Sequence, residues 1–203
     1  MAEISENPLS PDSKVCFVTT GATAPFTELI RSVLRPSSLD ALGHAGYTHL
    51  LIQYGTARSV FQQSVEVAQA HLQSEGGKVA LTIAGFDFDN NALKDQFKLV
   101  QDSKGLVISH AGSGTILAAL RYQVPLVVVP NTSLLDNHQE ELAAAMERSN
   151  YLLKGDVDNL DTVISTAEDF RVKMSQFPPI TSGKHRETKS FGAIMDETLG
   201  FMD

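Results

Sequence analysis

The sequence is poor in cysteine, in basic residues and in long apolar runs, and each shortage excludes a class of protein. The single cysteine, Cys16, excludes a disulfide framework and a thiolate zinc cluster, and it fits a reducing compartment. The 203 residues carry 16 basic and 24 acidic side chains, a formal charge of −8. This excess of acidic residues argues against general electrostatic binding of nucleic acid or anionic lipid, although a local basic patch is still possible. No apolar run approaches the roughly 18–20 residues that span a bilayer.

We also expect no targeting signal in the first residues of the sequence. Residues 1–13 are expected to form a flexible segment, which contains Glu3, Glu6 and two prolines but no basic region followed by an apolar core. We therefore expect a soluble protein of the cytosol, whose contact with any membrane depends on a partner.

Short apolar runs alternate with longer amphipathic stretches, which is typical of βαβ units and a parallel sheet. The candidate strands are Val15–Thr20, His49–Tyr54, Val79–Ala84, Leu106–Ser109 and Leu126–Val129. The candidate helices are Phe26–Leu34, Ala57–Ser74, Asn90–Gln101, Thr115–Tyr122, Gln139–Ser149 and Leu160–Phe170. Residues Pro36–Tyr47 form either a loop or a short helix. The pattern predicts an open α/β domain over residues 14–170, with a parallel sheet and helices on both faces.

Regular structure is expected to stop after this domain. The sequence Phe177-Pro-Pro-Ile contains two successive prolines, which remove backbone donors and restrict the residues before them, so residues 171–183 are predicted to be a linker. Residues 184–203 are predicted to form an amphipathic helix. Its apolar side chains recur at spacings of three or four residues: Phe191, Ile194, Met195, Leu199 and Met202.

The turns that follow the predicted strands are the first candidates for a site, because ligands bind open parallel sheets outside the carboxyl ends of the strands. The first turn is Thr20-Gly21-Ala22-Thr23-Ala24-Pro25-Phe26. Gly21 can adopt a backbone conformation closed to other residues, and Pro25 suits the first turn of a helix. Small residues let backbone amides approach an anion at the helix N-terminus. An ordinary tight turn between a strand and a helix remains the alternative for this segment.

The second turn is Ser109-His110-Ala111-Gly112-Ser113-Gly114-Thr115. Its glycines and hydroxyls bring amides and hydroxyls to the positive end of the following helix, where a negative group is favoured. The segment is neither a P-loop nor a G-x-G-x-x-G fingerprint, so it indicates phosphate binding without the lysine and magnesium of an NTPase. His110 has a simpler alternative role, which is to tie two loops together.

The third turn is Asn131-Thr132-Ser133-Leu134-Leu135-Asp136-Asn137-His138-Gln139. It carries more polar side chains than a helix N-cap requires, and its mixture of donors and acceptors suits sugar hydroxyls. An exposed N-cap with solvated neighbours is the alternative. All three turns are expected to lie at the same edge of the sheet.

Other chemical motifs are missing. The sequence has no catalytic triad, no G-x-S-x-G elbow and no pair of ligands with the spacing of H-E-x-x-H. Asp87 and Asp89 look like a carboxylate pair, but they are flanked by Phe86 and Phe88 and are predicted to form a turn and to cap the helix that follows.

Four motifs in this order resemble those of one known family: Phe17–Thr23, Gly85–Phe88, Val107–Thr115 and Leu135–Gln139. Over roughly Lys14 to Tyr151 the chain resembles the small cytosolic subunit of the eukaryotic UDP-N-acetylglucosamine (UDP-GlcNAc) transferase of N-glycan precursor synthesis. That enzyme adds the second GlcNAc to GlcNAc-diphosphodolichol at the cytosolic face of the endoplasmic reticulum. The resemblance implies the Rossmann-like, C-terminal-type half of a GT-B glycosyltransferase, related to the bacterial transferase that forms lipid II.

The resemblance also implies roles for the residues of the three turns. Those that would face the diphosphate are Gly21, Ala22 and Thr23 in the first turn and Gly112, Ser113, Gly114 and Thr115 in the second. Those that would reach the sugar hydroxyls or a phosphate are Asn137, His138 and Gln139. No metal or other cofactor is implied, since amides and helix dipoles would stabilise the departing UDP.

Two chemical roles are left open by the resemblance. Inversion at the anomeric carbon needs a base, for which the candidates are His110, His138 or a residue of a partner. Relatives commonly hold the ribose with a carboxylate at the position where this chain has Ala118. Either another group holds the ribose here or the affinity for the donor is reduced.

A single domain supplies half of a GT-B cleft, so the resemblance implies a separate, membrane-anchored subunit that binds the acceptor. By the same analogy, the apolar stripe from Phe191 to Met202 favours docking on that subunit over packing on its own domain. Two alternatives are a non-catalytic module that binds a nucleotide sugar or acts as a scaffold, and a sugar-nucleotide epimerase, for which the chain looks too short.

Overall fold

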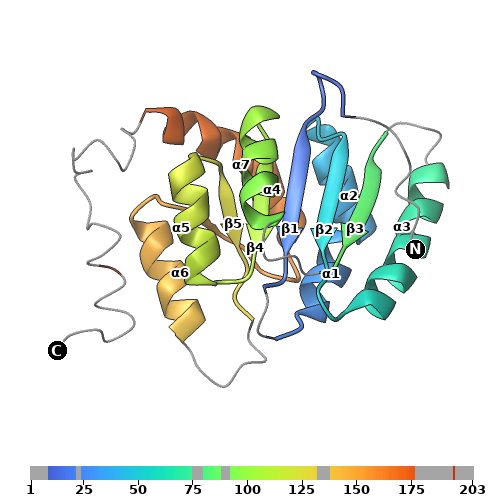
Figure 1. The fold of residues 1–203 in the computed structure, drawn as a ribbon, viewed down its shortest axis with the longest axis horizontal. Coiled ribbons are helices and arrows are strands. Elements are labelled where there is room, and N and C mark those ends of the chain that lie inside the picture. The colour runs from blue at the N-terminus through green and yellow to red at the C-terminus, as the bar shows by residue number, and fades with distance from the viewer. Residues whose placement is uncertain are drawn as a thin grey trace.

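A six-stranded parallel sheet forms the centre of the computed structural model, which describes residues 9–21, 24–74, 80–87, 92–131, 138–176 and 194. The strands are β1 (Val15–Thr19), β2 (His49–Gln53), β3 (Thr82–Phe86), β4 (Leu106–Ser109), β5 (Leu126–Val128) and β6 (Leu153–Lys154). They lie in the order β3-β2-β1-β4-β5-β6, and each neighbouring pair is parallel (Figure 1). The predicted open α/β fold is therefore confirmed.

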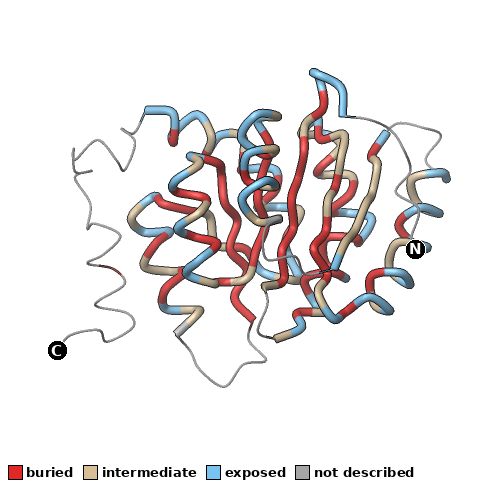
Figure 2. The backbone as a smooth tube through the Cα atoms, in the orientation of Figure 1, coloured by how far each residue is buried: buried red, intermediate tan, exposed pale blue. Residues whose placement is uncertain are grey.

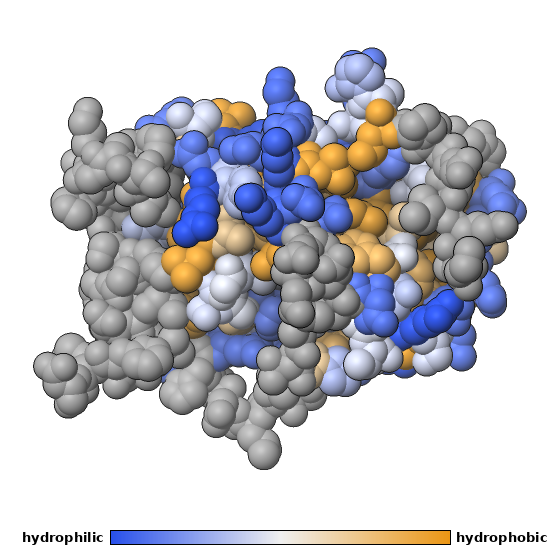
Figure 3. Space-filling model, viewed as in Figure 1, coloured by the Kyte–Doolittle hydropathy of each residue, from blue (hydrophilic) through white to orange (hydrophobic). Residues whose placement is uncertain are grey.

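Helices cover both faces of this sheet. Those on one face are α1 (Thr27–Val33), α2 (Pro36–His44), α3 (Arg58–Ser74) and α7 (Leu160–Ser175). Those on the other face are α4 (Ala92–Asp102), α5 (Ser113–Tyr122) and α6 (His138–Arg148). The outer surface of α4 is hydrophilic, whereas apolar side chains show beside it over the neighbouring strands (Figure 3). Among the described residues, no helix has the length and apolar character needed to cross a bilayer.

The central strands are largely buried (Figure 2). They lie between two hydrophobic clusters, one on each face of the sheet. Alternate residues of β1 point in opposite directions: Cys16 and Val18 pack with α1, α2, α3 and α7, while Val15 and Phe17 pack with α4, α5 and α6. All five residues of β1 are buried, as expected for a strand covered on both faces. The edge strand β3 is only half-buried along its length.

The structure differs from the sequence prediction mainly at the edges of the domain. The strand predicted at Val79–Ala84 is β3, which begins at Thr82 because its pairing with β2 starts there. The segment left open at Pro36–Tyr47 contains α2, with proline at the first helical position. The sequence does not predict β6, since two residues are too few to show an alternating pattern. α7 runs through Ser175, into the predicted linker, of which residues 177–183 lie outside the described chain.

A polar cluster ties α7 to the starts of the strands, at the end of the sheet opposite the predicted site. The carboxylate of Glu168 accepts a hydrogen bond from the Tyr47 hydroxyl at 2.7 Å and lies 3.0 Å from the Lys14 ammonium. Arg171 donates to Glu168 at 3.1 Å and to the carbonyl oxygen of Gly105 at 2.6 Å. Burial alone would raise the pKa of Glu168, but the hydrogen bonds from its three neighbours lower it.

Replacing Glu168 with glutamine is expected to lower the free energy of unfolding at pH 7 by about 1 kcal/mol, a modest value because the carboxylate is partly exposed. The folded pKa lies below the ordinary 4.5, so the stabilisation by this carboxylate is present above that pH and is lost as the pH falls through the folded pKa. Urea unfolding below pH 5 should therefore show that the free energy of unfolding falls more steeply with decreasing pH in the wild type than in Glu168→Gln.

The exposed Asp169 on the same helix provides the matched control. Asp169→Asn should leave both the stability and its pH dependence close to those of the wild type. Equal losses in the two variants would contradict the role of the Glu168 cluster.

Candidate functional site

The order of the strands reverses between β1 and β4. β1 pairs with β2 on one side and with β4 on the other, and Thr19 lies opposite Ser109 in the β1–β4 register. The chain continues from β1 to α1 on one face and from β4 to α5 on the other face. In sheets of this type the crevice at such a switch point receives the ligand. The first and second predicted turns therefore start side by side, and the third turn follows the adjacent β5.

The first turn is anchored to the end of β2. The buried Thr19 hydroxyl donates to the Gln53 side-chain oxygen at 2.6 Å and accepts the Gly21 amide at 3.3 Å. The Thr20 hydroxyl donates to the Gln53 carbonyl at 3.2 Å. Gly21 has a φ of +81°, a conformation that side chains rarely adopt, so the turn requires glycine. Ala22 and Thr23, which the resemblance assigns to the diphosphate, lie outside the described residues.

The second turn leads directly into α5. The His110 carbonyl accepts hydrogen bonds from the Gly112 amide and the Ser109 hydroxyl, both at 2.8 Å. Ser113 and Gly114 are exposed as the first residues of α5, where backbone amides have no acceptor within the helix. Thr115 is buried, and its amide bonds to the Gly112 carbonyl at 3.1 Å. An anion is therefore best received at the amides of Ser113 and Gly114.

The imidazole of His110 lies between these two turns. A Cβ built on Gly21 would lie 2.4 Å from its Cε1, and one built on Gly112 would lie 2.4 Å from its Nε2. Its Nδ1 is buried and makes no hydrogen bond of good geometry within the part of the chain that the structure describes. Burial lowers the pKa of His110, and a backbone hydrogen-bonding interaction with Thr19 opposes this only in part. The ring is therefore uncharged near neutral pH.

The third turn is described only at its two ends. Asn131 is buried, and its amide donates to the side-chain oxygen of Gln139 at 3.1 Å, which holds the start of α6 against the end of β5. Asn137 and the side chain of His138 lie outside the described residues. Of the three residues assigned to the sugar, only the position of the Gln139 side chain is known.

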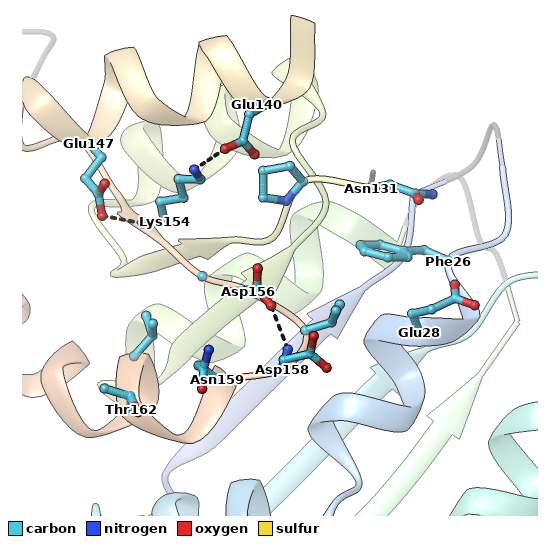
Figure 4. A pocket seen from close by; sticks show the side chains of 14 residues that line it. Phe26, Glu28, Asn131, Glu140, Glu147, Lys154, Asp156, Asp158, Asn159 and Thr162 are labelled. Atoms are coloured by element: carbon cyan, nitrogen blue, oxygen red, sulfur yellow. Dashed lines mark hydrogen bonds and ion pairs between the residues drawn. The ribbon is translucent and has the colours of Figure 1, made fainter. Parts of the chain in front are cut away.

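A cavity of about 530 Å³ opens at the same edge of the sheet, beyond β5 (Figure 4). Its wall comes from β6, from the loop between β6 and α7, and from parts of α1 and α6. The carboxylates that line it are Glu28, Glu140, Glu147, Asp156 and Asp158. Among the described residues that line it, Lys154 is the only cation, and it pairs with Glu140.

The cavity does not coincide with the predicted phosphate-binding turns. None of the described residues that line it is a glycine or hydroxyl residue of the first or second turn, although Phe26 and Asn131 connect it to the same edge. Its excess of carboxylates disfavours a diphosphate. This cavity could not be predicted from the sequence, because its acidic residues come from separate segments and form no motif. No cluster of three potential metal-binding side chains occurs in the described residues.

The C-terminal stripe is represented by one residue. Ile194 is 2% exposed and packs in the same hydrophobic cluster as α4, α5 and α6. At this position the chain packs on its own domain. Phe191, Met195, Leu199 and Met202 lie outside the described residues, and their docking on a partner stays a prediction. Ala118 on α5 is half-buried and packs against the same cluster.

Comparison with known proteins gives a consistent set of relatives. The family model of the glycosyltransferase family 28 C-terminal domain matches residues 15–189. A UDP-N-acetylglucosamine transferase subunit ALG13 from Eremothecium gossypii is 36% identical over 181 residues, which cover 82% of this chain and 86% of the relative. The subunit of the same name from Saccharomyces cerevisiae is 34% identical, over 70% of this chain and 77% of the relative.

Two solved structures are similar. The NMR solution structure of ALG13 has a TM-score of 0.57 and 31% identity, and it covers 78% of this chain and 87% of that one. The crystal structure of MurG from Acinetobacter baumannii has a TM-score of 0.51 at 20% identity, which supports the fold alone. That match covers 81% of this chain but only 46% of the MurG chain.

The neutral state of His110 predicts a pH-dependent stability. Its folded pKa lies below the ordinary 6.5, so as the pH falls the unfolded chain takes up a proton before the folded one. The stabilisation is present above about pH 6.5 and is lost below it. Between pH 7 and pH 5, the free energy of unfolding should therefore fall further in the wild type than in His110→Ala, by at most about 1.4 kcal/mol per pH unit.

Urea unfolding across this range measures the difference between the two proteins. His44 is exposed, so in the control His44→Gln the free energy of unfolding should fall with pH as it does in the wild type. If the free energy of unfolding of His110→Ala fell with pH as steeply as that of the wild type, the ring would not be held in its neutral form.

Proposed function

The chain belongs to the family of the glycosyltransferase family 28 C-terminal domain, and on this premise we propose that it is the catalytic, UDP-GlcNAc-binding subunit of a heteromeric inverting transferase. The reaction would add the second GlcNAc to GlcNAc-diphosphodolichol. The family resemblance indicated by the four sequence motifs is confirmed by relatives that are named UDP-N-acetylglucosamine transferase subunits.

The observation that carries this proposal is the meeting of two glycine turns at the β1–β4 switch point, beside the exposed N-terminus of α5. In the proposed complex, the amides of Ser113 and Gly114 would bind the diphosphate of the donor. The positive end of α5 favours this negative group before transfer and favours it more as UDP departs. Transfer would then need no metal ion.

The remaining groups of the site have proposed roles that follow from their positions in the turns. Ala22 and Thr23 would complete the diphosphate site next to Gly21, and Asn137, His138 and Gln139 would face the sugar. Deprotonation of the acceptor hydroxyl needs a base within hydrogen-bond reach. His138 or a residue of the partner is the better candidate, because the ring of His110 lies between two turns with its Nδ1 buried.

The partner would supply the other half of the cleft. The relatives carry the word subunit in their names, and this chain matches less than half of the MurG chain. We therefore propose that a membrane-anchored subunit binds the lipid-linked acceptor and holds this chain at the cytosolic face of the endoplasmic reticulum.

A non-catalytic role remains as the second candidate. Ala118 has no group that could hold a ribose, which favours a module that binds the nucleotide sugar weakly or serves as a scaffold. Donor binding without turnover in the assembled complex would support this alternative.

Gly114 allows a test of the phosphate site that leaves the fold intact. A Cβ on Gly114 meets no atom of a described residue within 4 Å, whereas a side chain on Gly112 would collide with His110. Gly114→Asp should keep or slightly raise the free energy of unfolding, by a few tenths of a kcal/mol, because an acidic residue suits the first turn of a helix. The same carboxylate would repel the diphosphate and weaken UDP-GlcNAc binding at least about tenfold.

Calorimetry with UDP-GlcNAc on the assembled transferase, beside urea unfolding of the chain, measures both effects. Gly114→Asn is the uncharged control of the same size and should lose less affinity. Wild-type affinity in Gly114→Asp would exclude the N-terminus of α5 as the phosphate site.

Purification from detergent-solubilised membranes tests the requirement for a partner. A second chain with a membrane segment should accompany this one, and the isolated chain should transfer no GlcNAc to a dolichyl-diphosphate acceptor. Adding the partner should restore transfer in a radiolabelled-sugar assay. Robust transfer by the isolated chain would refute the subunit proposal.

A further inference from the structure

Two glycines that lie far apart in the sequence face the same side chain. Gly21 follows β1, Gly112 follows β4, and the imidazole of His110 fills the space that a Cβ would occupy on either of them. We infer that His110 is a positioning residue, whose ring sets the separation of the two turns and thereby the alignment of the diphosphate-binding amides. The part of this inference that concerns the ligand rests on the proposed function.

The two contacts involve different atoms of one rigid ring. The ring atom nearest to a Cβ added at Gly21 is Cε1, at 2.4 Å, and the one nearest to a Cβ added at Gly112 is Nε2, at 2.4 Å. Real Cβ atoms essentially never approach this closely, so a methyl group on either glycine would have to displace the ring. By contrast, a Cβ on Gly114, two residues after Gly112, would meet no described residue within 4 Å.

The backbone that carries the ring is held in place. The His110 carbonyl accepts the Gly112 amide and the Ser109 hydroxyl, so the backbone of this residue cannot shift without breaking the turn itself. Gly112 has φ −80° and ψ 125°, which any residue can adopt. Its need for glycine therefore comes from the ring. At Gly21, where φ is +81°, both the backbone and the ring require glycine.

The chemistry of the ring suits a spacer better than a base. Burial lowers the pKa of His110 and keeps the ring uncharged, so it separates the turns without adding charge beside the α5 N-terminus. The buried Nδ1 makes no well-formed hydrogen bond to a described residue, and a Cβ on Gly112 would lie 2.4 Å from Nε2. A buried Nδ1 is not placed to accept the proton of an acceptor hydroxyl, as a general base must do.

A double-mutant cycle on the full chain tests the contact. Gly112→Ala should lower the urea midpoint of the wild type, and it should lower that of His110→Ala by less than half as much, because the obstructing ring is gone. Gly155→Ala is the matched control. Its Cβ would meet Val127 and Val129 rather than His110, so its effect should be the same in both backgrounds. Additive effects of Gly112→Ala and His110→Ala would overturn the contact.

Kinetics of the assembled transferase test the positioning role. His110→Ala should raise the KM for UDP-GlcNAc about tenfold and change kcat by less than about threefold, since it loosens donor binding without removing a proton acceptor. Adding Gly112→Ala to His110→Ala should recover part of the lost affinity. An unchanged KM would overturn the positioning role of His110. A fall in kcat of about a hundredfold or more at constant KM would also overturn it, and would indicate instead that His110 acts as the base.

The failure of the proposed function would look different. If the assembled wild-type protein neither bound UDP-GlcNAc nor transferred sugar while the stability coupling was present, the proposed function and the ligand part of this inference would both be overturned. The coupling itself would still establish His110 as the spacer of the two turns.

Discussion

The parallel pairing of β1 with β4 is the constraint on which the site depends. It places Thr19 opposite Ser109, so that two turns from distant parts of the sequence leave the sheet next to each other. One turn leads to a helix on one face and the other leads to a helix on the opposite face. The His110 ring lies between them. Without this pairing, neither the exposed amides of α5 nor the glycine of the first turn would have a neighbour across the crevice.

The sequence predicts the centre of the fold better than its edges. β1, β2, β4 and β5 lie within one residue of their predicted bounds, because strands buried on both sides appear as continuous apolar runs. β3 and β6 lie at the two edges, where burial is partial. Their limits depend on pairing with a neighbouring strand, which no local pattern records.

The candidate site, too, can be predicted from the sequence only in part. The glycine turns and the start of α5 can be found from the sequence, since Gly21 and Gly112 stand between a strand and a helix and Gly114 lies in the first turn of α5. Their individual reasons for being glycine cannot be found in this way. Gly21 and Gly112 both face the ring of His110, which is distant in sequence from Gly21, whereas a Cβ at Gly114 would meet no described residue within 4 Å. The acidic cavity likewise forms only in the tertiary structure. So does the placement of its negative charge and the positive end of α5 at the same edge of the sheet.

The central place of β1 also has a consequence for how the protein is made. β1 is synthesised before its partner β4, which is not available until Leu106–Ser109 has left the ribosome. During that interval one hydrogen-bonding edge of β1 has no partner strand in the nascent chain, although β1 is buried on both faces in the folded protein. Such non-local pairing slows folding and leaves the growing polypeptide open to aggregation. Chaperones that shield nascent strands would therefore be needed more by this protein than by one whose central strands form hairpins.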